Sequence, residues 1–266
     1  MILTDFALAW GLLTSIPLPF VPTHTSPSPG RAAAYFPLVG LILGLLLGGA
    51  DWIFALFLPP GVAAALLLVV WVGLTGMLHL DGFMDSCDGL LPLRDRERRL
   101  EIMKDSRVGA FGVVGGVLLL LLKFNALAAL PAAGRLATLV VAPALARGSM
   151  TWLMARYPRA RSGGLGVLFT TGLGWPQVGL AAAVTAGVAW GFLHELGLIL
   201  LAVTWLAATL IARLAMARLG GLTGDVYGAT GEVVETALLL VVVGLDHFPF
   251  VQNLSTCVIR ILFGVA

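Results

Sequence analysis

Residues 79–109 read HLDGFMDSCDGLLPLRDRERRLEIMKDSRVG and separate two long apolar stretches of the chain. Only 11% of the 266 residues are charged, yet this one segment holds six of the 16 lysines and arginines. Asp81, Asp85 and Asp88 stand at positions i, i+4 and i+7, which fall on one face of a helix. Three aligned carboxylates repel one another, so we expect a hard divalent cation between them. The alternative is a solvated acidic helix end.

The composition predicts an all-α polytopic integral membrane protein. Hydrophobic residues make up 59% of the chain, and a soluble domain is about 25% charged. Apolar stretches of about 20 residues recur, each long enough to cross a hydrocarbon core of about 30 Å. The net charge of +2 gives no electrostatic support to a nucleic-acid partner. The two cysteines form no CxxC pair, so neither a disulfide framework nor a zinc site is indicated.

The apolar stretches divide a single transmembrane domain, residues 1–266, into about seven predicted helices. Their approximate bounds are 36–57, 62–80, 110–130, 136–154, 178–193, 196–216 and 233–245. Residues 1–35 are expected to form an interfacial segment, because Pro17 and Pro19 interrupt their apolar run. They lack the basic start of a signal peptide, so no cleavage is expected. The variable tail, 246–266, is either an eighth span or a surface helix.

The distribution of basic residues predicts the orientation. If Arg31 lies in the cytoplasm and the spans alternate, 12 of the 16 basic residues lie on the cytoplasmic side, as the positive-inside rule requires. The same alternation brings most acidic side chains to that side, namely Asp81, Asp85, Asp88, Asp105, Asp225, Glu232 and Glu235. One cytoplasm-facing site, built from residues 80–108 and 217–235, is the simplest interpretation.

The second acidic motif, GDVYGATGE at residues 224–232, places Asp225 and Glu232 two helical turns apart. Facing the first acidic helix, it would hold two metals, or one metal and a basic substrate group. The alternative is a glycine surface for helix packing. Enzymes of phosphoryl transfer combine carboxylates, Mg²⁺ and basic side chains. Lys104 and Arg107 are therefore the expected phosphate contacts.

Other basic residues have simpler interpretations. A solvated cytoplasmic helix accounts for Arg94, Arg96, Arg98 and Arg99. The basic, glycine-rich loop at 156–166 could cradle a phosphate through its amides, although such a loop is usually only a turn. Lys123 and Arg147 lie within spans and either pair with an acid or extend to the membrane surface.

Several blocks of the sequence resemble one family. HLDGFMDSCDGL, RRLEIMKDSRVGAFGVVGGVLLLLLKFNAL and LTGDVYGATGEVVETALLL are similar to the corresponding blocks of the cobalamin synthases, the adenosylcobinamide-GDP ribazoletransferases. LTSIPLPF and RAAAYFPLVGLILG resemble the N-terminal block of that family. The resemblance covers residues 1 to about 245, and the tail that follows has no match.

The resemblance implies a late step of cobalamin biosynthesis in the cytoplasmic (inner) membrane of a bacterium or archaeon. The family transfers phosphocobinamide from adenosylcobinamide-GDP to α-ribazole or its 5′-phosphate, releases GMP and needs Mg²⁺. On this basis we expect Mg²⁺ ligands at Asp81, Asp85 and Asp88, with further catalytic carboxylates at Asp225 and Glu232 and phosphate contacts at Lys104 and Arg107. The sequence leaves open whether the protein forms a homo-oligomer in the bilayer. Exposed aromatics such as Trp175 or Tyr227 could contact the large corrinoid.

Two other functions compete with this one. A CDP-alcohol phosphotransferase has a similar reaction, but its DG-x2-AR motif is absent: Asp81-Gly82 is followed by FMDS, and Asp88-Gly89 by LLPL. An ion-coupled transporter would place its acids near the bilayer midplane. Here most acids gather at one predicted edge, and only Lys123 and Arg147 favour transport.

Overall fold

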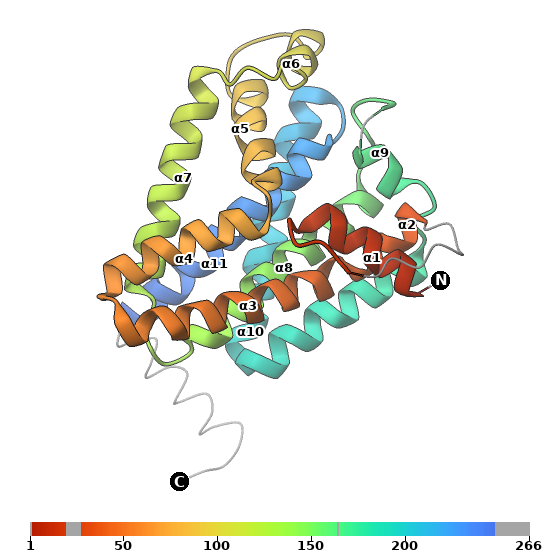
Figure 1. Ribbon diagram of the computed structural model, residues 1–266. Coiled ribbons are helices and arrows are strands. Elements are labelled where there is room, and N and C mark those ends of the chain that lie inside the picture. The colour runs from red at the N-terminus through yellow and green to blue at the C-terminus, as the bar shows by residue number, and fades with distance from the viewer. Residues whose placement is uncertain (1, 20–27, 164, 248–266) are drawn as a thin grey trace.

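The computed structural model describes residues 2–19, 28–163 and 165–247, and these form helices joined by short loops, with no strand (Figure 1). The helices are α1 (Ile2–Leu13), α2 (Pro29–Ala32), α3 (Phe36–Phe57), α4 (Pro60–Leu74), α5 (Leu78–Leu90), α6 (Arg96–Ile102), α7 (Ala110–Ala129), α8 (Arg135–Arg156), α9 (Leu165–Thr170), α10 (Trp175–Leu219) and α11 (Gly224–His247). The predicted all-α class is confirmed. The predicted tail, 246–266, lies almost wholly outside the described residues.

Helix α8 is the centre of the bundle and packs against α3, α10 and α11. Small residues allow the closest approach, since a Cβ atom at Gly44 of α3 would lie only 2.6 Å from the Cα of Val140 on α8. Most of α8 is buried, while α3, α7 and α10 expose many large apolar side chains, as expected for helices that face lipid.

Five described helices are long and apolar enough to cross a membrane: α3 with the short turns before it, α7, α8, α10 and α11. The bent pair α4–α5 would add a sixth. A multi-pass membrane protein is therefore confirmed, and the count of seven spans stays a prediction. Helix α1 has only 12 residues, which is too short to span and agrees with the interfacial segment predicted there.

Helix α10 contains two of the predicted spans. Its backbone leaves the helical region at His194 (φ 46°, ψ −122°), and the chain folds back so that Gly197 packs against the backbone of Ala189. Thr185 on one half and Thr204 on the other line one groove beside α8. The break falls between the predicted bounds 178–193 and 196–216.

The predicted span at 62–80 is wrong in one respect, because two helices meet there at an angle of 88°. Gly76 (φ 58°) and Met77 (φ 62°) adopt left-handed backbone, which an α-helix cannot continue through. Ser15 binds the last carbonyls of α4 beside this break: its N–H donates to Leu74 O (2.8 Å), and its hydroxyl donates to Gly73 O (2.7 Å), which also accepts from the N–H of Gly76. The bend turns the acidic helix α5 away from α4 and toward α6.

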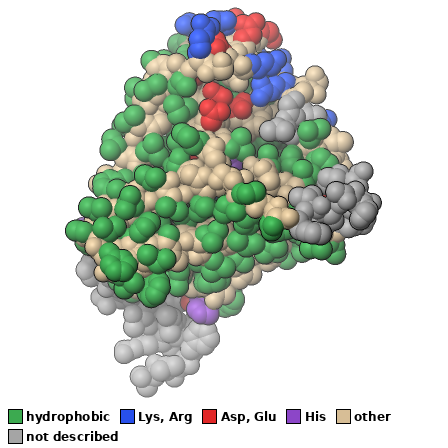
Figure 2. All heavy atoms as spheres, in the orientation of Figure 1, with side chains coloured by type: hydrophobic (Ala, Val, Ile, Leu, Met, Phe, Trp, Pro, Cys, Tyr) green, Lys and Arg blue, Asp and Glu red, His purple; other side chains and the backbone are tan. Residues whose placement is uncertain are grey.

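Charged side chains gather at one end of the molecule. Figure 2 shows lysine, arginine and acidic side chains at the end that carries α6 in Figure 1, above a flank covered mostly by hydrophobic side chains. Far from α6, Arg135 at the start of α8 pairs with Asp51 of α3 at 2.7 Å. The gathering of charged side chains at the α6 end supports the prediction of a single charged face.

Candidate active site

The two acidic helices, α5 and α11, cross where glycine allows their backbones to touch. A Cβ atom at Gly82 would lie 2.9 Å from the carbonyl oxygen of Asp225, so no larger residue fits without a shift. Gly228 packs against His79 in the same way. The expected meeting of the two motifs is confirmed at Asp81 and Asp225, and glycine packing produces it.

A cavity of about 240 Å³, here called the charged cavity, opens at this crossing. Its charged or titratable side chains come from α5, α11 and the loop after α8, and they are His79, Asp81, Asp225, Tyr227, Arg159 and Arg161. The rest of the wall is mostly apolar and comes from α1, α3, α5, α8, α9 and α11 and from the loops that precede α9 and α11. Two carboxylates and two guanidinium groups thus share a space with apolar walls, where electrostatic interactions are stronger than in water.

Asp85 and Asp88 occupy different surroundings on α5. Asp85 is partly buried and lies within electrostatic range of Asp81, Asp225 and Asp88. Asp88 is buried, and its carboxylate accepts hydrogen bonds from the backbone N–H groups of Gly109 (2.7 Å) and Gly112 (2.8 Å) at the start of α7. Asp88 therefore caps α7, whose N-terminal amides need acceptors. Its role as a metal ligand stays a prediction.

Arg159 and Arg161 were not predicted as site residues. Arg161 Nη2 lies 3.0 Å from Asp225 Oδ2, and both side chains are about one-fifth exposed. Arg159 is exposed, and its Nη1 lies 3.4 Å from the hydroxyls of Thr170 and Thr171. The sequence could have indicated these two arginines, because the positive-inside rule places their basic loop on the same side of the membrane as the acidic motifs.

The structure does not bring Lys104 and Arg107 to the charged cavity. Both are exposed in the loop between α6 and α7. Arg107 pairs with Asp105 through Nη2–Oδ2 (2.7 Å) and Nε–Oδ1 (3.0 Å). The hydrogen bonds from Arg107 lower the pKa of Asp105 to about 2. Contact of Lys104 and Arg107 with phosphate stays a prediction.

The interpretation of the arginines within residues 94–99 as solvated is wrong for Arg99, and Arg96 is exposed but also binds a backbone carbonyl. Arg99 is buried and donates from Nη1 to the carbonyls of Gly89 (2.7 Å) and Leu90 (2.8 Å), which end α5. Arg96 Nε donates to Leu219 O at the end of α10 (2.7 Å). These guanidinium groups satisfy helix carbonyls that lack partners. Arg94, Arg96 and Arg98 are exposed, as predicted.

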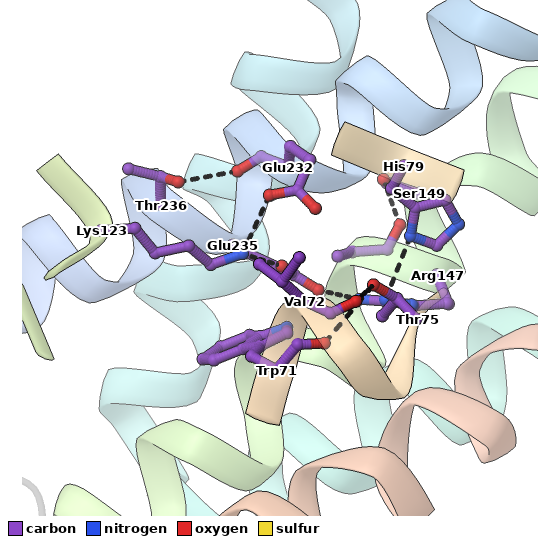
Figure 3. A network of polar contacts seen from close by, with 11 residues as sticks. Trp71, Val72, Thr75, His79, Lys123, Arg147, Ser149, Glu232, Glu235 and Thr236 are labelled. Atoms are coloured by element: carbon purple, nitrogen blue, oxygen red, sulfur yellow. Dashed lines mark hydrogen bonds and ion pairs between the residues drawn. The ribbon is translucent and has the colours of Figure 1, made fainter. Parts of the chain in front are cut away.

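A second charged cluster, here called the buried ion network, lies inside the bundle (Figure 3). It consists of Lys123 on α7, Arg147 on α8, and Glu232 and Glu235 on α11, and each of these side chains is at most 4% exposed. Lys123 Nζ lies 2.9 Å from Glu232 Oε2 and also pairs with Glu235. Arg147 pairs with the other oxygen of Glu235. Two positive and two negative charges therefore balance.

The buried ion network answers two open points from the sequence. Lys123 and Arg147 pair with acids and do not extend to the membrane surface, and Lys123 also lies 4.3 Å from the ring centre of Trp71. Glu232 points into this network instead of joining Asp225 at the charged cavity, and its catalytic role stays a prediction. Arg147 Nη2 also reaches His79 Nδ1 at 3.1 Å, so His79 links the network to the cavity.

The donor set of the charged cavity fits a magnesium ion that completes its coordination with substrate. Within the described part of the chain, no group of three or more His, Cys, Asp or Glu residues is arranged to hold a metal by itself. Asp81 and Asp225 nevertheless supply two carboxylates to one cavity. Mg²⁺ is usually bound through one or two carboxylates, with water and substrate phosphate at its other positions.

The two aromatic candidates for the corrinoid differ in their surroundings. Trp175 is 72% exposed at the start of α10. Tyr227 was predicted to be exposed, but it is 97% buried in the wall of the charged cavity.

Comparison with known proteins gives one consistent result. The family model for cobalamin-5-phosphate synthase matches residues 5–243. The chain is 44% identical over 240 residues to the adenosylcobinamide-GDP ribazoletransferase of Geotalea daltonii, with 90% of this chain and 97% of that protein covered. It is 43% identical to the proteins of the same name from Pseudomonas paraeruginosa (90% and 97% covered) and Deinococcus radiodurans (87% and 82% covered). No solved structure matches the chain.

Proposed function

Since the chain belongs to the cobalamin-5-phosphate synthase family, we propose that it transfers phosphocobinamide from adenosylcobinamide-GDP to α-ribazole or its 5′-phosphate. The observation that carries this proposal is the charged cavity, where Asp81 and Asp225 lie beside Arg159 and Arg161. Acids that can hold a metal and cations that can hold phosphate are the groups that such a transfer needs.

In the proposed reaction a ribose hydroxyl of the acceptor attacks the cobinamide-bound phosphorus of the diphosphate. A new oxygen–phosphorus bond forms, the bond from that phosphorus to the bridging oxygen breaks, and GMP leaves. The hydroxyl proton passes to a carboxylate outside the metal shell. When bound, Mg²⁺ would neutralise charge on the diphosphate.

We assign the metal to Asp81 and Asp225, with Asp85 beside them. Of the three predicted metal ligands, this assignment retains Asp81 and Asp85. It replaces Asp88, whose carboxylate already accepts two backbone hydrogen bonds. The arginines of the cavity would hold the anionic substrate in place, and positioning supplies much of the rate in phosphoryl transfer.

The proposed location is the cytoplasmic membrane, with the charged cavity open to the cytoplasm. Nucleotide substrates are available on that side. The positive-inside rule supports this orientation because the loops at the α6 end carry most of the basic residues.

The experiment is GMP release by the purified protein in liposomes, supplied with adenosylcobinamide-GDP and α-ribazole 5′-phosphate. We expect release that requires Mg²⁺ and the acceptor and that is lost in Asp81→Asn. Glu97→Gln is the control, since Glu97 is an exposed acid of α6 outside the cavity. No GMP release by folded protein, or release of CMP from CDP-alcohol substrates instead, would contradict the proposal.

A further inference from the structure

We propose that Arg159, Arg161 and Tyr227 form an anion subsite that binds the diphosphate of the nucleotide-linked substrate. The inference rests on the proposed function for the identity of that substrate. The chemistry of the subsite does not depend on it, because the three side chains line one cavity and all can donate hydrogen bonds to phosphate oxygens.

The backbone aims both arginines at the cavity. Ala160 N–H donates to Leu222 O, and Leu222 N–H donates to Pro158 O, each at 2.9 Å, which makes a short parallel bridge. In extended backbone, residues i and i+2 point to the same side. Arg159 and Arg161 accordingly both line the cavity, while Ala160 is buried in the hydrophobic core.

The segment that carries the arginines is fixed from two directions. Arg96 Nη2 donates to Ala160 O at 2.9 Å, and its Nε donates to Leu219 O, so one guanidinium joins the segment to the end of α10. On the other side, a Cβ atom at Gly221 would lie 2.5 Å from the carbonyl carbon of Arg159. An arginine pair held on such a segment loses less conformational freedom on binding than one on a free loop.

Tyr227 supplies an independent sign of a missing ligand. It is 97% buried and lines the cavity, yet its hydroxyl has no hydrogen-bond partner among the described residues. Arg159 and Tyr227 line the same cavity. A buried hydroxyl without a partner is unfavourable by about 1–3 kcal/mol. A ligand oxygen bound beside Arg159 would remove that penalty.

The charges select a diphosphate. The two guanidinium groups of Arg159 and Arg161 carry the opposite charge to the two carboxylates of Asp81 and Asp225, so these four side chains sum to zero. A divalent cation on the carboxylates would add two positive charges and release Arg161 from its ion pair with Asp225. A diphosphate esterified at both ends carries two negative charges and matches that sum. The first turn of α11, which begins at Gly224 in the cavity wall, adds the positive end of a helix dipole.

The test is the binding of GDP in the presence of Mg²⁺, measured by titration calorimetry on the full chain in nanodiscs. Charge-assisted hydrogen bonds predict that Arg159→Gln weakens binding by roughly 10- to 100-fold. Tyr227→Phe should weaken it by about threefold to tenfold. The unfolding temperature of Tyr227→Phe should stay the same or rise, because the deleted hydroxyl has no partner to lose within the part of the chain that the structure describes.

Arg156→Gln is the matched control, because Arg156 is an exposed arginine at the end of α8 that does not line the cavity. Parent-like binding by Arg159→Gln would overturn the inference. So would equal weakening in Arg156→Gln, or no binding by the folded parent. Binding that depends on Arg159 in a protein that releases no GMP would contradict only the proposed function.

Discussion

The charged cavity and the buried ion network contain equal numbers of charged groups but differ in how these groups are paired and exposed. Each has two cations and two carboxylates. In the network every carboxylate pairs with a cation, and each side chain is at most 4% exposed. In the cavity, Asp81 is exposed, and no ion pair joins Arg159 to a carboxylate of the described chain. Buried charges that are fully paired hold the helices of the network together. Charges that are exposed or lack an ion-pair partner in the cavity are available to a ligand.

The two regions share a helix and a histidine. Asp225 and Glu232 lie on α11 two turns apart, a rise of about 10 Å, so one faces the cavity while the other lies deeper in the bundle. His79 lines the cavity and contacts Arg147 of the network. Substitutions can therefore be chosen that alter one region and spare the other.

The largest effect is expected from Glu235→Gln, which removes the carboxylate that pairs with both Lys123 and Arg147. Breaking a buried pair from one side lowers the free energy of unfolding by about 3–5 kcal/mol. Thermal unfolding in detergent measures this loss. A double variant, Lys123→Met with Glu232→Gln, removes one charge of each sign and should be more stable than Lys123→Met alone. Equal stability of these two variants would show that charge balance is not what holds the network.

Asp81→Asn should affect activity and leave stability unchanged, in contrast to Glu235→Gln. The side chain is exposed to the cavity, so the unfolding temperature should stay near that of the parent. GMP release should fall by about a hundredfold, the usual scale for losing one preorganised electrostatic contact. Parallel unfolding and activity measurements check both expectations. An unfolding temperature that falls in step with the activity would place Asp81 among the structural charges.

Asp88→Asn separates a helix cap from a metal ligand. An amide keeps one acceptor for the N–H groups of Gly109 and Gly112, so we expect a stability loss of about 1 kcal/mol. The Mg²⁺ concentration that gives half-maximal activity should not change. A large increase in that concentration would restore the predicted role of Asp88 in metal binding.

The smallest effect is expected from Arg107→Gln. Its partner Asp105 loses hydrogen bonds, so the pKa of Asp105 should rise from about 2 toward its ordinary value. The lowered pKa contributes a small stability that is present above the ordinary pKa and is lost as pH falls toward 2. Arg107→Gln should therefore lose this small contribution near neutrality and match the parent below about pH 2. Carboxyl chemical shifts report the titration. A strong loss of GDP binding at pH 7 would instead support the predicted phosphate contact.

Sequence reasoning identified the features that depend on local pattern. The helix predicted at 36–57 coincides with α3, and the break at His194 falls between the spans predicted at 178–193 and 196–216. The meeting of the two acidic motifs followed from charge bias and topology. Each of these arguments needs only composition and periodicity.

The parts that sequence reasoning missed depend on tertiary contacts. The bend at Met77 relies on left-handed backbone that few non-glycine residues adopt, so the sequence offered little sign of it. The spacing of Asp225 and Glu232 showed that they share a face of α11, but not how deep each one lies. The arginines of the loop after α8 reach the cavity through a backbone bridge to Leu222, a residue about 60 positions away along the chain.

The most direct test compares Asp225→Asn with Glu232→Gln, two amide substitutions in one motif. GMP release is measured per folded molecule, with unfolding temperature recorded for both. The account predicts that Asp225→Asn remains folded and loses release, while Glu232→Gln is destabilised but releases GMP normally from the molecules that fold. A fully stable, inactive Glu232→Gln beside an active Asp225→Asn would contradict the division between cavity and network.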